Sequence, residues 1–150
     1  MYNEQATEQA PKPAAPKKPL KRVVKPLQGN LQDLAYQYFL ATDWRLFKAI
    51  TNKAGIYDNE YMMQNAMATC ITYDDYGLAI ICLKEGLELT TIEAYSLLIH
   101  EAVHLWQAHC EYIGEEAPGD EIEAYAIQKI ATELMKEYTR LKELPSAVVA

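Results

Sequence analysis

Apolar positions recur with helical spacing over three stretches of this sequence. The first stretch follows Asn30, a residue type that favours helix N-caps, and Asp33 stands three positions later. We predict a first helix over residues 31–54, broken near Thr42-Asp43 and ending before Gly55. Its apolar stripe, which we assign to the core, consists of Leu31, Leu34, Ala35, Tyr38, Phe39, Leu46, Phe47 and Ile50.

The second and third helical stretches carry clearer boundaries. Thr90 is a good N-cap and Glu93 completes a capping box, while Gly114 is a natural C-terminal stop, so a long helix is predicted over 91–113. After Pro118-Gly119, Asp120 is the expected cap of a helix that runs to about Leu144. The apolar stripe of this last helix consists of Ile127, Ile130, Ala131, Leu134, Tyr138 and Leu141.

A β-hairpin is predicted between the first and second helices. Residues 69–73 are rich in β-type side chains, residues 74–77 supply turn chemistry and residues 78–83 form a short apolar run. Residues 56–68 fit helix and strand equally well. The chain is therefore expected to be an α+β domain, mainly helical, with a small antiparallel sheet or hairpin packed on the long helix.

Composition separates an N-terminal tail from this domain. Residues 1–28 hold five of the seven prolines and six of the fourteen basic residues, with two acidic ones, so their net charge is +4. Such a segment buries too little apolar surface to offset the entropy of ordering. We expect a disordered, Pro/Lys/Ala-rich tail over 1–28 and one compact domain over 29–150.

Charge and apolar run length restrict the partners and the compartment. The whole chain carries −7, which leaves −11 for the domain and disfavours specific binding of nucleic acid. No apolar run approaches the roughly 20 residues that cross a bilayer, and the polar start does not resemble a secretory signal. We expect a cytoplasmic protein without a membrane partner. Its three cysteines, expected to be buried thiols, are Cys70, Cys82 and Cys110.

The candidate chemistry lies in the middle of the long helix. The segment His100-Glu101-Ala102-Val103-His104 has the pattern H-E-x-x-H. On a helix, residues i and i+4 share one face, so both imidazoles can bind a single Zn²⁺, and the glutamate after the first histidine can act as general base. The alternative is a helix that carries two polar histidines without a metal.

A zinc hydrolase needs a third protein ligand besides the two histidines. In one family of zinc peptidases this is a histidine ten positions after the first, with a glycine turn between. Here Cys110 and Gln107 occupy those positions, so that pattern fails. His109 lies roughly 140° around the helix from His104 and is expected at the surface or against a partner.

Glutamates on the last helix are the other candidates. Glu123 falls on the apolar stripe, whereas Glu121 faces the polar side. A carboxylate on a buried face needs a compensating partner, and a metal ion would be one. Glu123 could alternatively occupy position N3 of a capping box with Asp120.

The spacing carries a resemblance to a known group. His100, Glu101 and His104, then eighteen residues, then Glu123 on a following helix resemble the gluzincin type of H-E-x-x-H zinc metallopeptidases, and Glu123-Ala124-Tyr125-Ala126-Ile127-Gln128 is similar to the third-ligand helix of small phage or bacterial metallopeptidases. The resemblance covers roughly residues 70–140. It implies a minimal zincin-like domain that hydrolyses peptide or protein substrates.

The resemblance also implies roles for individual residues. His100, His104 and Glu123 would bind Zn²⁺, and Glu101 would take a proton from water and deliver it to the leaving amine. A short sheet would lie above the metal helix and pair its edge strand with an extended substrate; Leu78–Leu83 is the expected edge. Candidate second-shell partners of the histidines are Gln107 and Glu111.

Two points stay open at the level of sequence. The donor to the oxyanion is not decided among Tyr76, Tyr112, Tyr125 and His109, and Ile127 stands where related patterns place a polar orienting residue. The same motif also fits a catalytically silent, zincin-like binding or regulatory module. The sequence does not specify the substrate or the oligomeric state.

Overall fold

The computed structural model describes residues 26–27, 34–57 and 66–144 of the chain. The expected tail over 1–28, the proposed N-cap at Asn30 and the ambiguous segment over 58–65 lie almost entirely outside these ranges. The described elements follow one another along the chain in the order β1 (Gln37–Ala41), α1 (Trp44–Ala54), β2 (Ala68–Tyr73), a 3₁₀ turn η1 (Asp74–Tyr76), β3 (Leu78–Leu83), α2 (Thr91–Ile113) and α3 (Asp120–Glu143).

The three strands form one mixed sheet in the order β1-β3-β2. β2 pairs antiparallel with β3, with Cys70 opposite Ile81, and η1 closes the expected hairpin. β1 pairs parallel with β3, with Phe39 opposite Ile80. The expected α+β class is therefore confirmed, but the sheet is not purely antiparallel.

β3 is the central strand, so the prediction that Leu78–Leu83 forms the edge was wrong. All six of its residues are buried. A continuous apolar run is typical of a strand that is covered on both faces, because neither face then needs polar side chains. Within the described chain the edge beside the helices is β2, whose residues are all partly exposed.

The prediction of one helix from residue 31 to 54 was wrong in its first half. Residues 37–41 form β1, in which every residue after Gln37 is buried. The parallel pairing with β3 supplies backbone partners that the helical spacing did not reveal. The helical half is confirmed: Asp43 caps α1 by accepting the Leu46 N–H at 2.8 Å, and Gly55 ends it at a φ of 73°.

The two long helices are confirmed. Thr90 and Glu93 form the expected capping box, and Gly114, at a φ of 71°, ends α2. α3 begins at Asp120, but its N-cap is Gly119 with no side-chain cap, so the expected capping role of Asp120 was wrong. Glu123 is thus free of the competing capping-box role.

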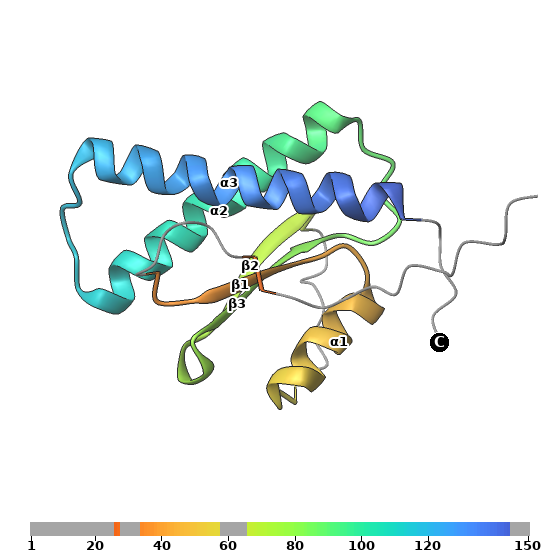
Figure 1. Cartoon of the computed structure of the whole chain (residues 1–150), viewed down its shortest axis with the longest axis horizontal. Helices are drawn as coiled ribbons and strands as arrows, with labels where there is room; N and C mark the ends of the chain where they lie inside the picture. Colours follow the sequence, from red (N-terminus) through yellow and green to blue (C-terminus); the bar gives the residue numbers. More distant parts are fainter. Residues whose placement is uncertain (1–25, 28–33, 58–65, 145–150) are drawn as a thin grey trace, which may run out of the picture.

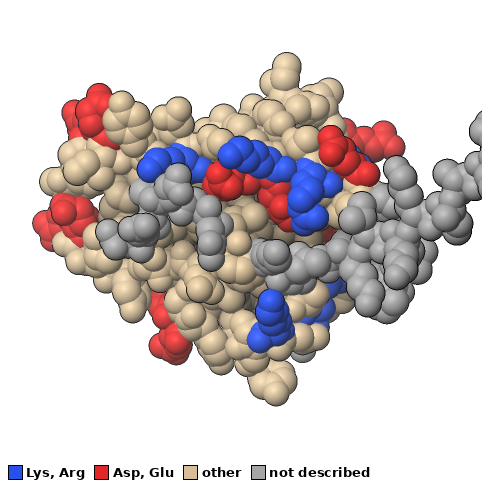
Figure 2. All heavy atoms as spheres, viewed as in Figure 1, with Lys and Arg blue, Asp and Glu red and all other residues tan. Residues whose placement is uncertain are grey.

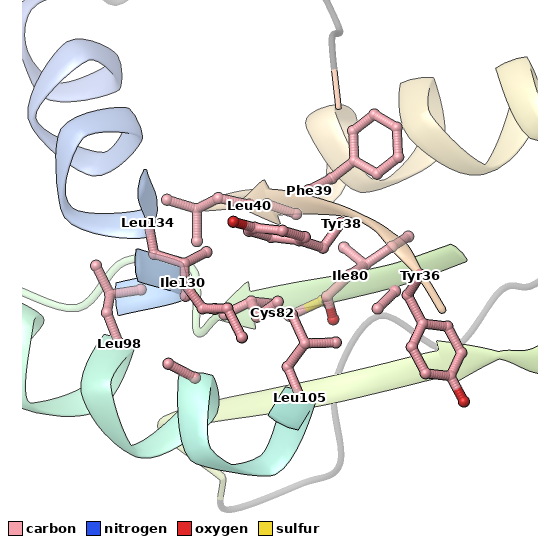
Figure 3. Packing of buried hydrophobic residues seen from close by; sticks show 14 of the residues in the cluster. Tyr36, Tyr38, Phe39, Leu40, Ile80, Cys82, Leu98, Leu105, Ile130 and Leu134 are labelled. Carbon is pink, nitrogen blue, oxygen red and sulfur yellow. Dashed lines mark hydrogen bonds between the residues drawn. The ribbon is translucent and has the colours of Figure 1, made fainter. Parts of the chain in front are cut away.

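The core lies between the helical pair and the sheet. In Figure 1, α2 and α3 lie on one side of the strands and α1 lies on the other. Figure 3 shows Leu98 and Leu105 of α2 and Ile130 and Leu134 of α3 directed toward the strand residues. Leu98, Leu105, Ile130 and Leu134 are each fully buried. This packing fixes the rotation of α2 and so decides which of its residues face outward.

Charge is unevenly distributed over the surface of the described chain. Figure 2 shows acidic side chains at the end where α2 joins α3, and basic side chains along the later turns of α3. The connection contributes Glu115, Glu116 and, on the first turn of α3, Asp120 and Glu121. None of the helices in the described ranges combines the length and the apolarity that crossing a bilayer requires.

Candidate metal centre

The two histidines of the motif converge on one point. Their Nε2 atoms lie 3.0 Å apart, and the ring centroids are 4.7 Å apart at an interplanar angle of 76°. Both side chains are exposed on α2, one turn from each other. This is the arrangement that the spacing predicted, and it follows from helical geometry once the opposite face of α2 is buried.

The separation of the two nitrogen atoms fits a tetrahedral metal ion. Zinc binds imidazole nitrogen at about 2.0–2.1 Å, so two such ligands in a tetrahedron lie about 3.3 Å apart. The observed 3.0 Å differs from that value by only a few tenths of an ångström. Small χ rotations are therefore enough to bring both rings to bonding distance.

Gln107 sets the tautomer of one ligand. Its Oε1 accepts a hydrogen bond from Nδ1 of His104 at 3.2 Å. With Nδ1 protonated, the Nε2 of a neutral His104 carries the lone pair that a metal needs. In the 3.0 Å contact, Nε2 of His100 is then the donor. The prediction that Gln107 supports His104 is borne out in its geometry.

Glu101 lies behind the histidine pair and is buried, with 4% of its surface exposed. Burial raises the pKa of its carboxyl group above 4.5, while the nearby His104 and His100 and the backbone N–H of Cys70 oppose that rise. A carboxylate held in this way has a higher proton affinity than one at the surface. That property suits a group that must take up a proton near neutral pH.

A polar groove of about 440 Å³ runs between α2 and the edge strand β2 and exposes this cluster. Its walls are Ala68, Thr69, Cys70 and Thr72 from β2 and His100, Glu101, His104, Gln107, Ala108 and Glu111 from α2. The Cys70 side chain is mostly buried, and this burial raises its thiol pKa to about 12, so it is a neutral wall residue and not a ready nucleophile.

Main-chain groups of β2 face the same groove. Lys84 N donates to Met67 O at 2.9 Å, which directs Met67 toward β3. Because the two sides alternate along an antiparallel strand, the N–H and C=O groups of Ala68, Cys70 and Thr72 point away from β3. The backbone N–H of Cys70 already bonds Glu101. The other outward groups have no strand partner within the described chain.

Glu123, the predicted third ligand, makes a different contact. Its Oε2 accepts a hydrogen bond from Nε1 of Trp106 at 3.0 Å, and the residue is exposed. Glu123 therefore faces α2, as its position on the stripe indicated. Among the described residues, however, no three histidine, cysteine, aspartate or glutamate side chains are close enough to hold one ion. The structure brings together His100, Glu101 and His104 and leaves Glu123 outside the group.

Glu121, the alternative third ligand, lies on the first turn of α3 and is also exposed. It is outside the residues that line the groove. Its partner on the same turn, Glu123, is the one that contacts α2. The geometry thus favours Glu123 over Glu121 as the carboxylate nearer to the metal helix.

His109 is buried, so the prediction that it lies at the surface or against a partner was wrong. Its Nδ1 accepts the backbone N–H of Ala35 at 3.0 Å, and its ring lies 5.2 Å from that of Trp106. Burial lowers the pKa of His109 below 6.5. The residue packs α2 against the segment before β1, a contact with a residue 74 positions away that the local pattern could not reveal.

The remaining candidates for an oxyanion donor do not reach the groove. Tyr76, Tyr112 and Tyr125 are 54%, 57% and 60% exposed and are not among the residues that line it. Thr69 and Thr72, which the sequence analysis did not single out, do line it. The signal for them was present: threonines in an imperfectly apolar strand are typical of an edge that faces solvent on one side.

Comparisons of the chain with protein-family models, with curated protein sequences and with solved structures returned no match. The assignment of chemistry to this site therefore depends on the geometry of His100, Glu101 and His104 and on the groove that contains them.

Proposed function

We propose that this chain is a zinc-dependent metallopeptidase that hydrolyses peptide bonds in the groove between α2 and β2. The observation that carries the proposal is the 3.0 Å approach of the two Nε2 atoms beside a buried carboxylate. Histidine pairs on a solvated helix face have no reason to converge within reach of a common ion while a glutamate is held in a low-dielectric site behind them. The cost of burying that carboxylate is understandable if it takes part in chemistry.

His100 and His104 would hold the ion, with Glu123 as the third ligand. When bound, zinc supplies Lewis acidity, which polarises a carbonyl group and makes water acidic enough to lose a proton near neutral pH. Gln107 keeps the proton of His104 on Nδ1 and so leaves Nε2 available. Glu123 must exchange its hydrogen bond with Trp106 for this role, which its exposed position on the first turn of α3 permits.

Glu101 would act as general base and then as general acid. Its carboxylate takes a proton from the attacking water, and its raised pKa favours that transfer. It then delivers the proton to the nitrogen of the leaving amine as the C–N bond breaks. An extended substrate would be held by the outward main-chain groups of β2, which places its backbone alongside Glu101 and the histidines.

A second candidate is a catalytically silent module that holds an extended segment of a partner. The contact between Glu123 and Trp106 favours this alternative, because it withholds the third ligand. The groove and the edge strand serve both functions equally well.

Metal content and cleavage separate the two candidates. We expect the purified chain to bind one zinc ion, and His100→Ala and His104→Ala to abolish that binding. Glu101→Gln should retain zinc but lose chelator-sensitive cleavage of a peptide library. Zinc bound without cleavage by the wild-type chain would favour the binding module. Equal zinc content in the wild type and in both histidine variants would exclude the metal site.

A further inference from the structure

The groove between α2 and β2 has two chemically different ends. Beside the polar groove lies a second hollow of about 450 Å³, which shares Ala68, His100 and Glu101 with it. Its other walls are mainly apolar and come from Met67, Ile92, Glu93, Ser96 and Leu97. Two of these apolar side chains are strongly exposed: Met67 by 46% and Ile92 by 79%. An extended apolar surface of this kind is typical of a site that receives a partner side chain.

The opposite end is polar and acidic. Gln107 and Glu111 lie one and two turns beyond His104 on the same side of α2, and both line the groove together with Thr72. Glu111 is exposed, and no described cation forms a salt bridge with it. Acidic residues of the adjoining connection, Glu115 and Glu116, add to the negative charge at this end of the molecule. Electrostatic complementarity favours a cationic side chain there.

The direction of β2 fixes which end of a bound peptide meets which chemistry. Met67 and Ala68, at the start of β2, share a hollow with the N-terminal half of α2. At the other end, Tyr36 connects the two elements: its Oη donates to Asp74 Oδ1 at 2.8 Å, and its ring lies 5.7 Å from that of Tyr112. β2 and α2 therefore run in the same direction.

Antiparallel pairing is slightly more stable per residue than parallel pairing. A peptide that adds to β2 in this way has its N-terminal part near Thr72 and Glu111 and its C-terminal part near Met67 and Ile92. Glu111 lies seven residues after His104, about 10 Å along the helix axis. At roughly 3.3 Å per residue of extended peptide, that distance corresponds to about three positions.

We propose that the groove selects peptides that carry an arginine or lysine about three residues before the central bond and a large apolar residue just after it. Glu111 recognises the basic side chain, and the hollow formed by Met67, Ile92 and Leu97 receives the apolar one. The proposal rests on the proposed function for the position of the central bond. Recognition itself depends only on the two ends of the groove and on the edge strand.

The test compares three fluorescent decapeptides by anisotropy, with the full chain kept in a chelator so that no metal contributes. The first has Arg three residues before a central Ala-Leu pair, the second has Glu in place of Arg, and the third has the basic and apolar positions exchanged. We expect the first to bind about three- to fivefold more tightly than either of the others, as a single solvent-exposed charge pair allows.

Two matched variants locate the preference. Glu111→Gln should abolish the discrimination between Arg and Glu, whereas Glu116→Gln, the same charge change outside the groove, should keep it. Equal binding of the three peptides, or equal loss in the two variants, would overturn the proposal. So would tighter binding of the exchanged peptide.

Cleavage of the same peptides by the zinc-loaded chain, followed by mass spectrometry, separates this proposal from the proposed function. Selective binding without any cleavage would leave the recognition proposal standing and would overturn the peptidase. Cleavage of all three peptides at equal rates would support the peptidase and overturn the recognition proposal. Neither binding nor cleavage would overturn both.

Discussion

Substituting Trp106 should tighten zinc binding if Glu123 is the third ligand. In the structure the indole Nε1 donates to Glu123 Oε2 at 3.0 Å, and Glu123 is not grouped with the histidines. To reach the metal, the carboxylate must give up this hydrogen bond and leave the N–H of Trp106, a residue that is 6% exposed, without its partner. Trp106→Phe removes that cost and keeps an aromatic ring in place.

The size of the effect follows from the contact. Hydrogen bonds to charged groups contribute about 1.5–3 kcal/mol, and the exposure of Glu123 puts this one near the lower limit. A difference of about 1.4 kcal/mol corresponds to a tenfold change in an equilibrium constant. We therefore expect Trp106→Phe to lower the Kd for Zn²⁺ about tenfold. Glu123→Gln should raise it.

The assay is a competition between the protein and a chromophoric chelator at pH 7. The chain contains two tryptophans, and Trp44 supplies the control because its ring packs on Phe47 in α1, outside the groove. Trp44→Phe should leave the zinc Kd unchanged. Circular dichroism and thermal unfolding of the metal-free variants would establish that each is folded.

Two results would refute this reasoning. Unchanged zinc affinity in both Trp106→Phe and Glu123→Gln would show that Glu123 is not a ligand. Weaker affinity in Trp106→Phe would show that the indole orients the carboxylate toward the metal, as a second-shell donor does, and does not compete with it.

Further predictions concern acid–base behaviour, packing and thiol chemistry. Burial raises the pKa of Glu101, so its ionisation favours the folded state only below pH 4.5 and opposes folding as the pH rises through the folded value; at pH 7, metal-free Glu101→Gln should melt at a higher temperature than the wild type, and an equal or lower Tm would contradict this. Burial lowers the pKa of His109, so its contribution to stability is complete above pH 6.5 and is lost as the pH falls through the folded value; His109→Asn, which keeps an acceptor for Ala35 N–H, should flatten the loss of stability measured by urea unfolding between pH 7 and 5, and an unchanged slope would exclude His109 as its source. Leu134 is fully buried, so Leu134→Ala should lower the free energy of unfolding by about 2–5 kcal/mol in the same assay, while a loss below 1 kcal/mol would contradict the packing. The raised thiol pKa of Cys70, about 12, should make its alkylation at pH 8 slower than that of an unfolded control by on the order of a hundredfold or more, and equal rates would contradict its burial.

Local sequence signals were sufficient wherever an element is stabilised by its own residues. The capping box of Thr90 with Glu93 and the stop at Gly114 fixed the bounds of α2. The same helix carries the histidines, so their convergence could be predicted from spacing alone. Asp43 marked the start of α1 in the same way, because its cap depends only on a residue three positions away.

Predictions failed where a distant segment decides the structure. Residues 37–41 carry apolar side chains at positions that fit a helix, but the open side of β3 gives them a parallel strand partner about 40 positions away. The continuous burial of Leu78–Leu83 is the mark of a central strand, and assigning it to the edge overlooked that a substrate-pairing edge must be partly polar. His109 followed the same rule, since its partner Ala35 comes from the segment before β1.

The third ligand shows a different kind of limit. Spacing and periodicity place Glu123 on the face of α3 that meets α2, and the contact with Trp106 agrees with that placement. They do not decide between two acceptable partners for one exposed carboxylate, since the choice depends on side-chain rotation and on whether an ion is bound. Sequence reasoning can name the helix and the face, while the state of the side chain is a question of binding equilibrium.

The parts of the site therefore differ in how far they are organised in advance. The histidine pair, the Nδ1 contact of His104 with Gln107 and the buried Glu101 are held by the packing of α2, which needs no metal. Glu123 is held by a single hydrogen bond on an exposed turn. A hydrolase requires that this bond be weaker than the bond to zinc, whereas a binding module does not. The free-energy difference between those two contacts of Glu123, rather than any further feature of the groove, separates the two functions.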